Sequence, residues 1–270
     1  MDDGMIVTVY VVIDDVLRAL GHRSHVLAHL SDPEVLLVAV VAALYFQNHH
    51  ERALQVMHGM RYLSGKLSVS RFNRRLHALG DWLRLLLAAL GEVFAVGEAF
   101  LIDSLPVPVC RRVRARRCRK VRGAAYCGYC AAKREKVFGW RLHLVCTVDG
   151  VRVAFDLLPA SLHDLTPVHE LTVGLPDGAS VYGDKASNSA ADEASILADA
   201  GVRLVPIRKA NMRPNVWADK LFLRECRKRI ESLNSHLEAM GLQRLRARTN
   251  AGFEIKVHAS LLALVCANAR

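Results

Sequence analysis

Long apolar runs are missing from this sequence of 270 residues. The longest, over residues 35–46, has 12 residues, which is too short to cross a bilayer. Another apolar run, over residues 5–13, follows Asp2 and Asp3, whereas a secretory signal carries positive charge at that place. We therefore expect neither a membrane span nor a secretory signal.

Cysteine is sparse and has no regular pattern. The seven cysteines are an odd number at irregular spacing, so no disulfide framework is expected. Cys127 and Cys130 have the spacing of a metal-binding pair, but a structural zinc site needs four ligands, usually from two such pairs. Cys110 and Cys118 are the other nearby thiols, at wide and uneven spacing. We expect no zinc site and a reduced, cytoplasmic environment.

Acidic residues are almost absent from one segment. Residues 110–141 hold 12 Lys and Arg against a single acid, Glu135, while the rest of the chain is balanced in charge. The net charge of +11 therefore resides in this segment, as in proteins that bind a polyanion, and nucleic acid is the first partner to consider. At 52% hydrophobic residues the composition excludes a disordered chain, a collagen-like repeat and a coiled coil.

The first hundred residues are expected to be helical. Ser31 and Glu34 have the spacing of a capping box before an apolar run, with Pro33 in the first turn. The apolar spacing predicts three helices, over residues 31–46, 50–63 and, beginning at Ser68 or Ser70, to 89.

After Gly97 the pattern changes to strands alternating with helices. A short strand at 99–102 is expected to end at Asp103, closed by Pro106 and Pro108, and Asp149-Gly150 predicts a hairpin between the two strands that follow. The remaining expected elements lie at residues 137–148 (strand), 151–158 (strand), 165–173 (helix), 179–182 (strand), 190–200 (helix, stopped by Gly201), 202–207 (strand), 220–240 (helix) and 252–268 (helix). This order is that of a ribonuclease H-like fold, with a mixed α/β sheet.

Carboxylates stand where two of these strands end. Asp103 follows the first strand and Asp184 the fourth, and these strands are neighbours in this order of elements. A third acid is available on the long helix as Glu225, Glu231 or Glu238, and the cations flanking Glu231 favour it. Converging carboxylates repel each other unless cations bind, and oxygen ligands favour Mg²⁺ or Mn²⁺. Two such ions can activate an attacking hydroxyl and stabilise the leaving oxygen of a phosphodiester.

Several motifs resemble the DDE-class transposases of bacterial insertion sequences, and most of all insertion-sequence family 982. The first-aspartate motif is Ile102-Asp103-Ser104-Leu105-Pro106-Val107-Pro108-Val109-Cys110. Further blocks are Leu67–Leu76, Gly128–Ala131, Gly139-x-x-x-His143, Leu162-His163-Asp164, Tyr182–Ala186, Arg229-Ile230-Glu231 and Gln243–Thr249. Two positions depart from the family pattern: Ser187 replaces an aromatic residue, and Glu238 replaces the Lys of some related groups.

The resemblance implies a helical, DNA-binding domain over residues 1–95 and a ribonuclease H-like catalytic domain over 96–270, with a basic insertion at 110–136. It implies the catalytic and metal-binding triad Asp103, Asp184 and Glu231, with Mg²⁺ or Mn²⁺ as cofactor and two ions expected. The activity would be cleavage of element ends and joining of the 3′-hydroxyl to target DNA, by a homodimer or larger assembly on double-stranded DNA at the bacterial nucleoid. A nuclease that does not join, and a DNA-binding remnant without chemistry, remain as alternatives.

Basic and polar side chains near these acids are expected to contact DNA. The N-terminal candidates lie at the start of the helix after Ser70, as in a recognition helix. The basic segment would contact phosphates without reading sequence, and a solvated charged face is the alternative for both groups. The expected DNA-binding residues are Arg71, Asn73, Arg74, Arg75, Arg111, Arg112, Arg114, Arg116, Arg117, Arg119, Lys120, Lys185, Arg227, Lys228, Arg244, Arg246 and Arg248.

Overall fold

The computed structural model describes residues 1–131, 133–208, 212 and 214–268, apart from the side chain of Arg227. The chain forms two compact units. Residues 1–90 and 236–270 make up the helical unit, and residues 91–235 make up the sheet unit. The boundaries fall within two helices, α5 (Gly80–Phe94) and α8 (Trp217–Ala239).

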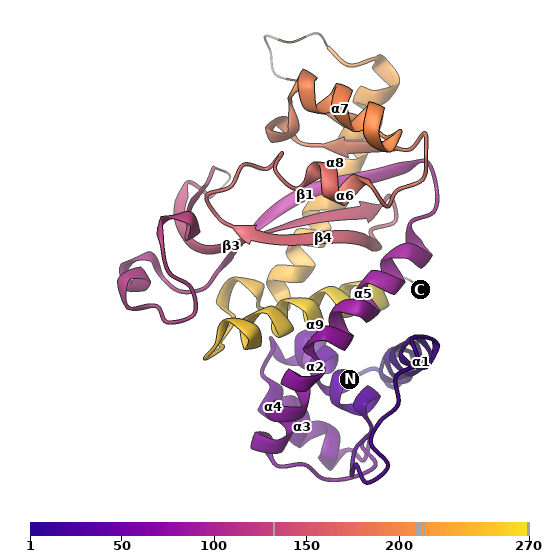
Figure 1. Ribbon diagram of the computed structural model, residues 1–270, viewed down its shortest axis with the longest axis vertical. Helices are drawn as coiled ribbons and strands as arrows, with labels where there is room; N and C mark the ends of the chain where they lie inside the picture. Colours follow the sequence, from indigo (N-terminus) through magenta and orange to yellow (C-terminus); the bar gives the residue numbers. More distant parts are fainter. Residues whose placement is uncertain (132, 209–211, 213, 269–270) are drawn as a thin grey trace. The chain divides into compact units, whose positions relative to one another are not determined.

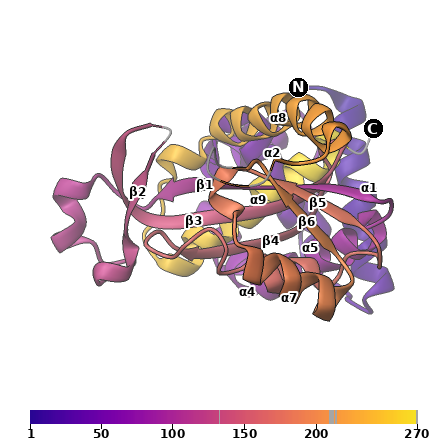
Figure 2. The ribbon, with the colours of Figure 1, turned by 90° about the horizontal axis from the view of Figure 1, so that it is seen from above.

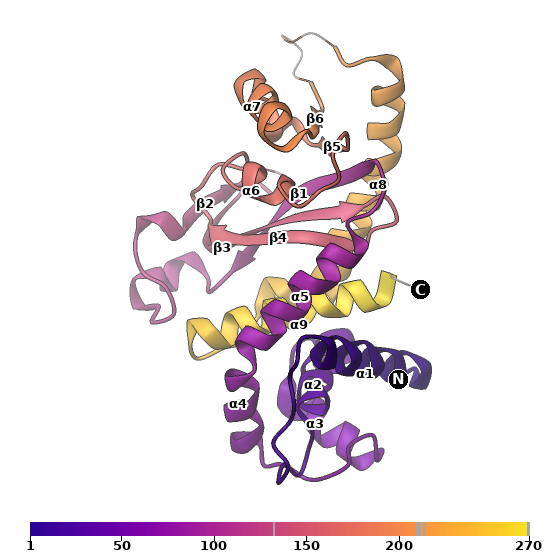
Figure 3. The ribbon, with the colours of Figure 1, turned by 45° about the vertical axis from the view of Figure 1, so that its right-hand side comes forward.

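The helical unit is built around α2 (Asp32–Phe46), whose residues 33–43 are all buried. A helix that is apolar on every side belongs in a core, and α2 packs against α1 (Asp3–Ala19), α3 (His50–Gly59), α4 (Val69–Ala78) and α9 (Asn250–Asn268). Figure 3 shows these helices grouped around α2. The predicted capping box is confirmed: the Ser31 side chain accepts from the Glu34 amide, and the Glu34 carboxylate accepts from the Ser31 amide.

The C-terminal segment packs in the helical unit, although we predicted it as part of the sheet domain. The α9 side chains Phe253, Leu261 and Leu262 are buried, and α9 contacts α1, α2 and α4. Asn48 follows α2, and its side-chain Nδ2 donates to the Met240 carbonyl at 2.9 Å and to Ser260 Oγ at 2.8 Å. The apolar residues of a helix do not indicate which core it packs in, so the sequence could not predict this arrangement.

The sheet unit contains one mixed sheet, formed in the described residues by six strands. They are β1 (Ala99–Pro108), β2 (Cys127–Cys130), β3 (Glu135–Thr147), β4 (Arg152–Pro159), β5 (Ser180–Gly183) and β6 (Arg203–Pro206). The order is β2-β3-β1-β5-β6, with β4 also paired to β3. β1, β3 and β4 are antiparallel, whereas β5 and β6 run parallel to β1. This is the ribonuclease H-like arrangement that the sequence predicted.

Helices cover both faces of this sheet. One face packs Phe100, Val181 and Leu204 against α6 (Val168–Thr172) and α7 (Ala190–Ala200). The other packs Leu101 and Tyr182 against α8. Figure 2 shows the sheet between α7 and α8, and in Figure 1 α8 runs behind the strands.

The first strand is longer than predicted, because Pro106 and Pro108 do not end it. β1 pairs with β3 as far as Pro108, and the Val109 amide donates to the Phe138 carbonyl. Alternate residues of a strand direct their amides to opposite edges, so both prolines direct their missing N–H away from β3. β5 pairs only with residues 99–101 of β1, so the edge that the prolines face carries no β5 partner.

Some of the other local predictions are confirmed and others are wrong. The Asp149-Gly150 hairpin and the stop at Gly201, in the left-handed conformation, are confirmed. The single helix predicted to residue 89 is wrong, because α4 ends at a cap on Leu79 and α5 begins at Gly80. The strand β2 was not predicted. None of the helices in the described residues combines the length and the apolar character needed to cross a membrane.

Candidate active site

Asp103 and Asp184 lie at the same level of two neighbouring parallel strands. The last registered pair between β1 and β5 is Leu101 with Tyr182. Asp103 is two residues beyond Leu101, and Asp184 is two residues beyond Tyr182. Because side chains alternate between faces, both aspartates belong to the face that Leu101 and Tyr182 present to α8. The spacing of neighbouring strands, about 4.8 Å, brings the two carboxylates together.

The Asp103 carboxyl is unusually hard to ionise. Its pKa is raised to about 6, chiefly by burial and also by the nearby charges of Asp184 and Asp164. A hydrogen bond from the Ser104 amide and another from Asn234 oppose these effects. Asn234, on α8, donates from Nδ2 to Asp103 Oδ2 at 2.7 Å. The charge at Asp103 is therefore costly in the absence of a bound cation, and its orientation is fixed.

Asp184 begins a short 3-10 turn, Lys185–Ser187. Its Oδ1 accepts from the Ala186 amide at 2.8 Å. Desolvation raises the pKa of this carboxyl, and the charge of Asp164 raises it further. The turn packs closely over Gly183, where a Cβ atom would lie 2.9 Å from Ser187 Oγ. Ser187 is buried, so the small side chain at this position suits the tight approach.

Glu231 lies on α8, three residues before Asn234, and its side chain is exposed. Three residues are nearly one helical turn, so Glu231 is on the side of α8 near Asn234 and hence near Asp103. Glu225 is nine residues before Asn234, half a turn away around the helix. Glu238 belongs to the helical unit. No group of three or more His, Cys, Asp or Glu in the described residues is close enough to hold a metal ion, so the third acid stays a prediction.

A family model described as a transposase DDE domain matches residues 95–248, more than half of the chain. The chain belongs to this family. No curated protein and no solved structure matches it. Membership implies a transposase with DNA as its substrate, and the matched range contains all three predicted acids.

Two charged residues lie close to the site of this transposase domain, and the sequence indicated one of them only weakly and the other not at all. Asp164 lies in the loop between β4 and α6, and its charge acts on both aspartates. Arg141, on β3, forms an ion pair with Asp164 at 2.7 Å. The His-Asp motif at 163–164 hinted at the first residue. Nothing in the spacing of the two residues, 23 positions apart, identified the second.

The basic segment forms an extension of the sheet unit beyond one end of β1 and β3, together with β2 (Figure 2). Residues 112–117 make a 3-10 helix with no buried residue. Lys120 is tied down, since its Nζ donates to the Val109 carbonyl at 2.8 Å. Cys127 and Cys130 lie three positions apart in β2, so they point to opposite faces of the strand. The exposed predicted residues of this segment are Arg111, Arg112, Arg114, Arg116, Arg117 and Arg119.

The other predicted DNA contacts lie in different places. Arg71, Asn73 and Arg74 are exposed on α4, whereas Arg75 is held inside the helical unit by Asp32 and by the Leu30 carbonyl. Lys185 and Lys228 are exposed on the sheet unit, and the Arg227 side chain lies outside the described residues. Three exposed arginines that were expected near Glu231 belong to the helical unit: Arg244, Arg246 and Arg248.

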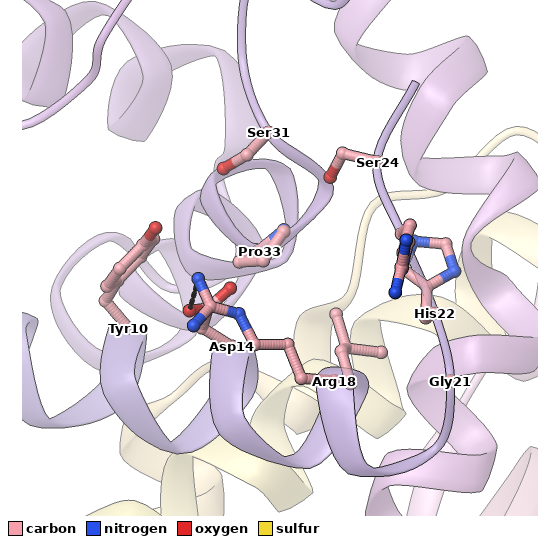
Figure 4. A pocket seen from close by; sticks show the side chains of 10 residues that line it. Tyr10, Asp14, Arg18, Gly21, His22, Ser24, Ser31 and Pro33 are labelled. Atoms are coloured by element: carbon pink, nitrogen blue, oxygen red, sulfur yellow. Dashed lines mark ion pairs between the residues drawn. The ribbon is translucent and has the colours of Figure 1, made fainter. Parts of the chain in front are cut away.

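A hollow of about 630 Å³ opens in the helical unit, between α1 and the start of α2 (Figure 4). Its lining includes Asp14, Arg18 and His22. Asp14 and Arg18 neutralise each other in an ion pair of 2.8 Å, and the hollow contains none of the three predicted acids.

Proposed function

We propose that this chain is a metal-dependent DNA transposase of a bacterial insertion sequence related to family 982. It cleaves the ends of its element and joins the exposed 3′-hydroxyl to target DNA. The observation that carries the proposal is the placement of Asp103 on β1 and of Asp184 directly after the neighbouring strand β5 in a transposase DDE domain. It acts in the cytoplasm, on DNA of the nucleoid.

The donor chemistry fits a divalent cation. Asp103 and Asp184 are oxygen ligands whose pKa values are both raised, and a cation relieves the repulsion that contributes to this rise. Asp103, Asp184 and, from α8, Glu231 would hold Mg²⁺ or Mn²⁺, with two ions expected. When bound, such ions stabilise charge on the attacking and leaving oxygens of a phosphodiester.

The chain itself orients these ligands. Asn234 fixes one oxygen of Asp103, and the Ala186 amide fixes one oxygen of Asp184. Hydrogen bonds of this kind hold a ligating carboxylate in one direction, so the site is prepared before DNA arrives. We place Glu231 opposite them because its helix already contacts Asp103 through Asn234.

DNA is held by surfaces outside the acids. The exposed arginines of residues 111–119 contact phosphates, and Arg71, Asn73 and Arg74 on α4 contact the element end. Further positive charge comes from Lys185 and Lys228 on the sheet unit and from Arg244, Arg246 and Arg248 on the helical unit. Residues 1–95 thus contribute recognition and the sheet contributes chemistry, in a homodimer or larger assembly on the two ends.

Strand transfer tests this proposal. A labelled duplex that ends in an inverted repeat, taken from the DNA flanking the gene, is incubated with the protein, Mg²⁺ and a supercoiled plasmid. Label joined covalently to the plasmid is the expected result. Cut but unjoined label would identify a nuclease of the same fold. Binding without cutting would identify a remnant that has lost its chemistry.

A further inference from the structure

An ion pair lies behind the two aspartates, on the opposite face of β1. Arg141 and Ser104 share the face of the sheet that packs against α6 and α7, since Ser104 pairs with His143 and Arg141 is two residues away on β3. Asp164 reaches this face from the loop before α6. One oxygen, Asp164 Oδ1, accepts both from Ser104 Oγ at 2.8 Å and from Arg141 Nη1 at 2.7 Å.

The pair is anchored and shielded from solvent. Arg141 Nη2 also donates to the Tyr129 carbonyl of β2 at 3.0 Å. The side chains of Arg141 and Asp164 are 16% and 21% exposed, so their charges are weakly screened. Each is therefore a fixed charge at a defined place beside the strand that carries Asp103.

The two charges lie next to the strand that carries Asp103, because Asp164 is hydrogen-bonded to Ser104, the residue after Asp103, and Arg141 is paired with Asp164. They act on the carboxylates in opposite directions: Asp164 raises the pKa of Asp103 and of Asp184, and Arg141 lowers that of Asp184. A divalent cation carries twice the charge of a proton and responds to the same field. Attraction to Asp164 and repulsion from Arg141 must both affect its binding.

We propose that the Arg141–Asp164 pair sets the affinity of the Asp103–Asp184 site for its divalent cation. Asp164 strengthens cation binding without being a ligand, and Arg141 weakens it. Both are positioning residues, because they act through the electric field at the site and do not touch the cation. This inference rests on the proposed metal-dependent function.

A purely structural role makes a different prediction. If the pair only joined β1, β3 and the 160–166 loop, removing either partner would disturb the site in the same way. The electrostatic role requires opposite signs: Asp164→Asn leaves an uncompensated cation near the site, and Arg141→Gln leaves an uncompensated anion. The double variant restores the balance.

Binding of Mn²⁺ to the full chain without DNA measures this, by the loss of the free-ion electron paramagnetic resonance signal. Asp164→Asn should weaken binding by roughly three- to tenfold, and Arg141→Gln should strengthen it by roughly two- to fivefold. The double variant should bind within about twofold of the parent. Glu193→Gln is the matched control, since Glu193 forms an ion pair of similar exposure with Arg208 in the same unit. It should leave Mn²⁺ affinity unchanged.

Ser104→Ala keeps both charges and removes one hydrogen bond, and it covers the case in which a charge variant does not fold. Parental affinity in this variant supports the electrostatic role, and a loss comparable to that expected for Asp164→Asn overturns it. Shifts of the same sign in Asp164→Asn and Arg141→Gln also overturn it, while the proposed function stands if Asp103→Asn still abolishes binding. A parent that binds no Mn²⁺ would overturn both.

Discussion

Burial of the Asp103 carboxyl makes the stability of the folded chain depend on pH. Its pKa rises from an ordinary 3.8 to about 6 in the folded chain, chiefly through burial. Between those values the folded protein still binds a proton that the unfolded chain has released. Stability contributed by this group is therefore present at low pH and lost as the pH rises.

Without divalent cations, the free energy of unfolding of the parent should fall between about pH 4 and pH 6. The Asp103 contribution is on the order of 2–3 kcal/mol. Asp103→Asn should remove that part of the slope and have a larger free energy of unfolding than the parent near pH 7. Urea unfolding from about pH 4 to pH 7 in EDTA compares the two proteins. Parallel curves of stability against pH for the parent and Asp103→Asn would show that the pKa of this carboxyl is not raised in the folded chain.

Residues whose role depends on long-range contact were the least predictable. Asp184 could be found because it directly follows a strand, and strand ends are visible in sequence. Asp103 was found as the expected end of the first strand, although β1 continues past it to Pro108. Arg141 alternates on β3 like any exposed residue of a strand. Its role depends on the ion pair with Asp164, which the loop after β4 brings close to it. No local pattern in the sequence predicts that contact.

Elements were predicted where the local signals were complete. The Asp-Gly hairpin, the Ser31 cap and the Gly201 stop each require only a few adjacent residues. Pro106 and Pro108 gave the wrong end for β1, because their effect depends on which edge of the strand carries a partner. The sequence shows the prolines but does not show which edge of the strand is paired.

The basic segment predicts a salt effect. Replacing Arg111, Arg112, Arg114 and Arg116 by Gln should weaken binding to every duplex alike. The slope of log affinity against log salt should flatten by about 0.9 for each phosphate that is no longer neutralised. Fluorescence anisotropy at several salt concentrations measures the slope, with Arg84→Gln, an exposed arginine of α5, as control. An unchanged slope would mean that this segment does not contact DNA.

The exposed start of α4 predicts a specificity effect instead. Alanine at Arg71, Asn73 and Arg74 should reduce the preference for the element end over random duplex by about 1–3 kcal/mol for each base that is no longer recognised. Competition binding with both duplexes measures it. Lys66→Ala, which removes an exposed charge just before α4, should keep the preference. Equal weakening on both duplexes would limit these side chains to backbone contacts.

At the scale of the whole molecule, residues 236–270 pack with residues 1–90 in one unit. α9 and the Asn48 hydrogen bonds join residues 236–270 to residues 1–90. The sequence predicted α9 as a helix but assigned it to the sheet, because its apolar residues fit any core. The family match, over residues 95–248, stops just before this returning helix.

Asn48→Gly tests that closure. Asn48 has a φ of 64°, which glycine adopts freely, so the substitution mainly removes the bonds to Met240 and Ser260. The free energy of unfolding of the helical unit should fall by about 1–3 kcal/mol. Denaturant unfolding measures it, with Asn73→Gly on exposed α4 as a comparison. A loss no larger than that of the comparison would show that these bonds do not stabilise the unit.

The central claim is that Asp103, Asp184 and Glu231 act together on DNA. Its most direct test is Mg²⁺-dependent cleavage of the element end by Asp103→Asn, Asp184→Asn and Glu231→Gln. Each substitution keeps the side-chain size and removes one anionic ligand. We predict that all three variants fold, bind DNA and fail to cleave. Glu225→Gln and Glu238→Gln should cleave at near-parental rates. Cleavage that survives in Asp103→Asn would contradict the mechanism, and cleavage abolished in Glu238→Gln but kept in Glu231→Gln would contradict the choice of the third acid.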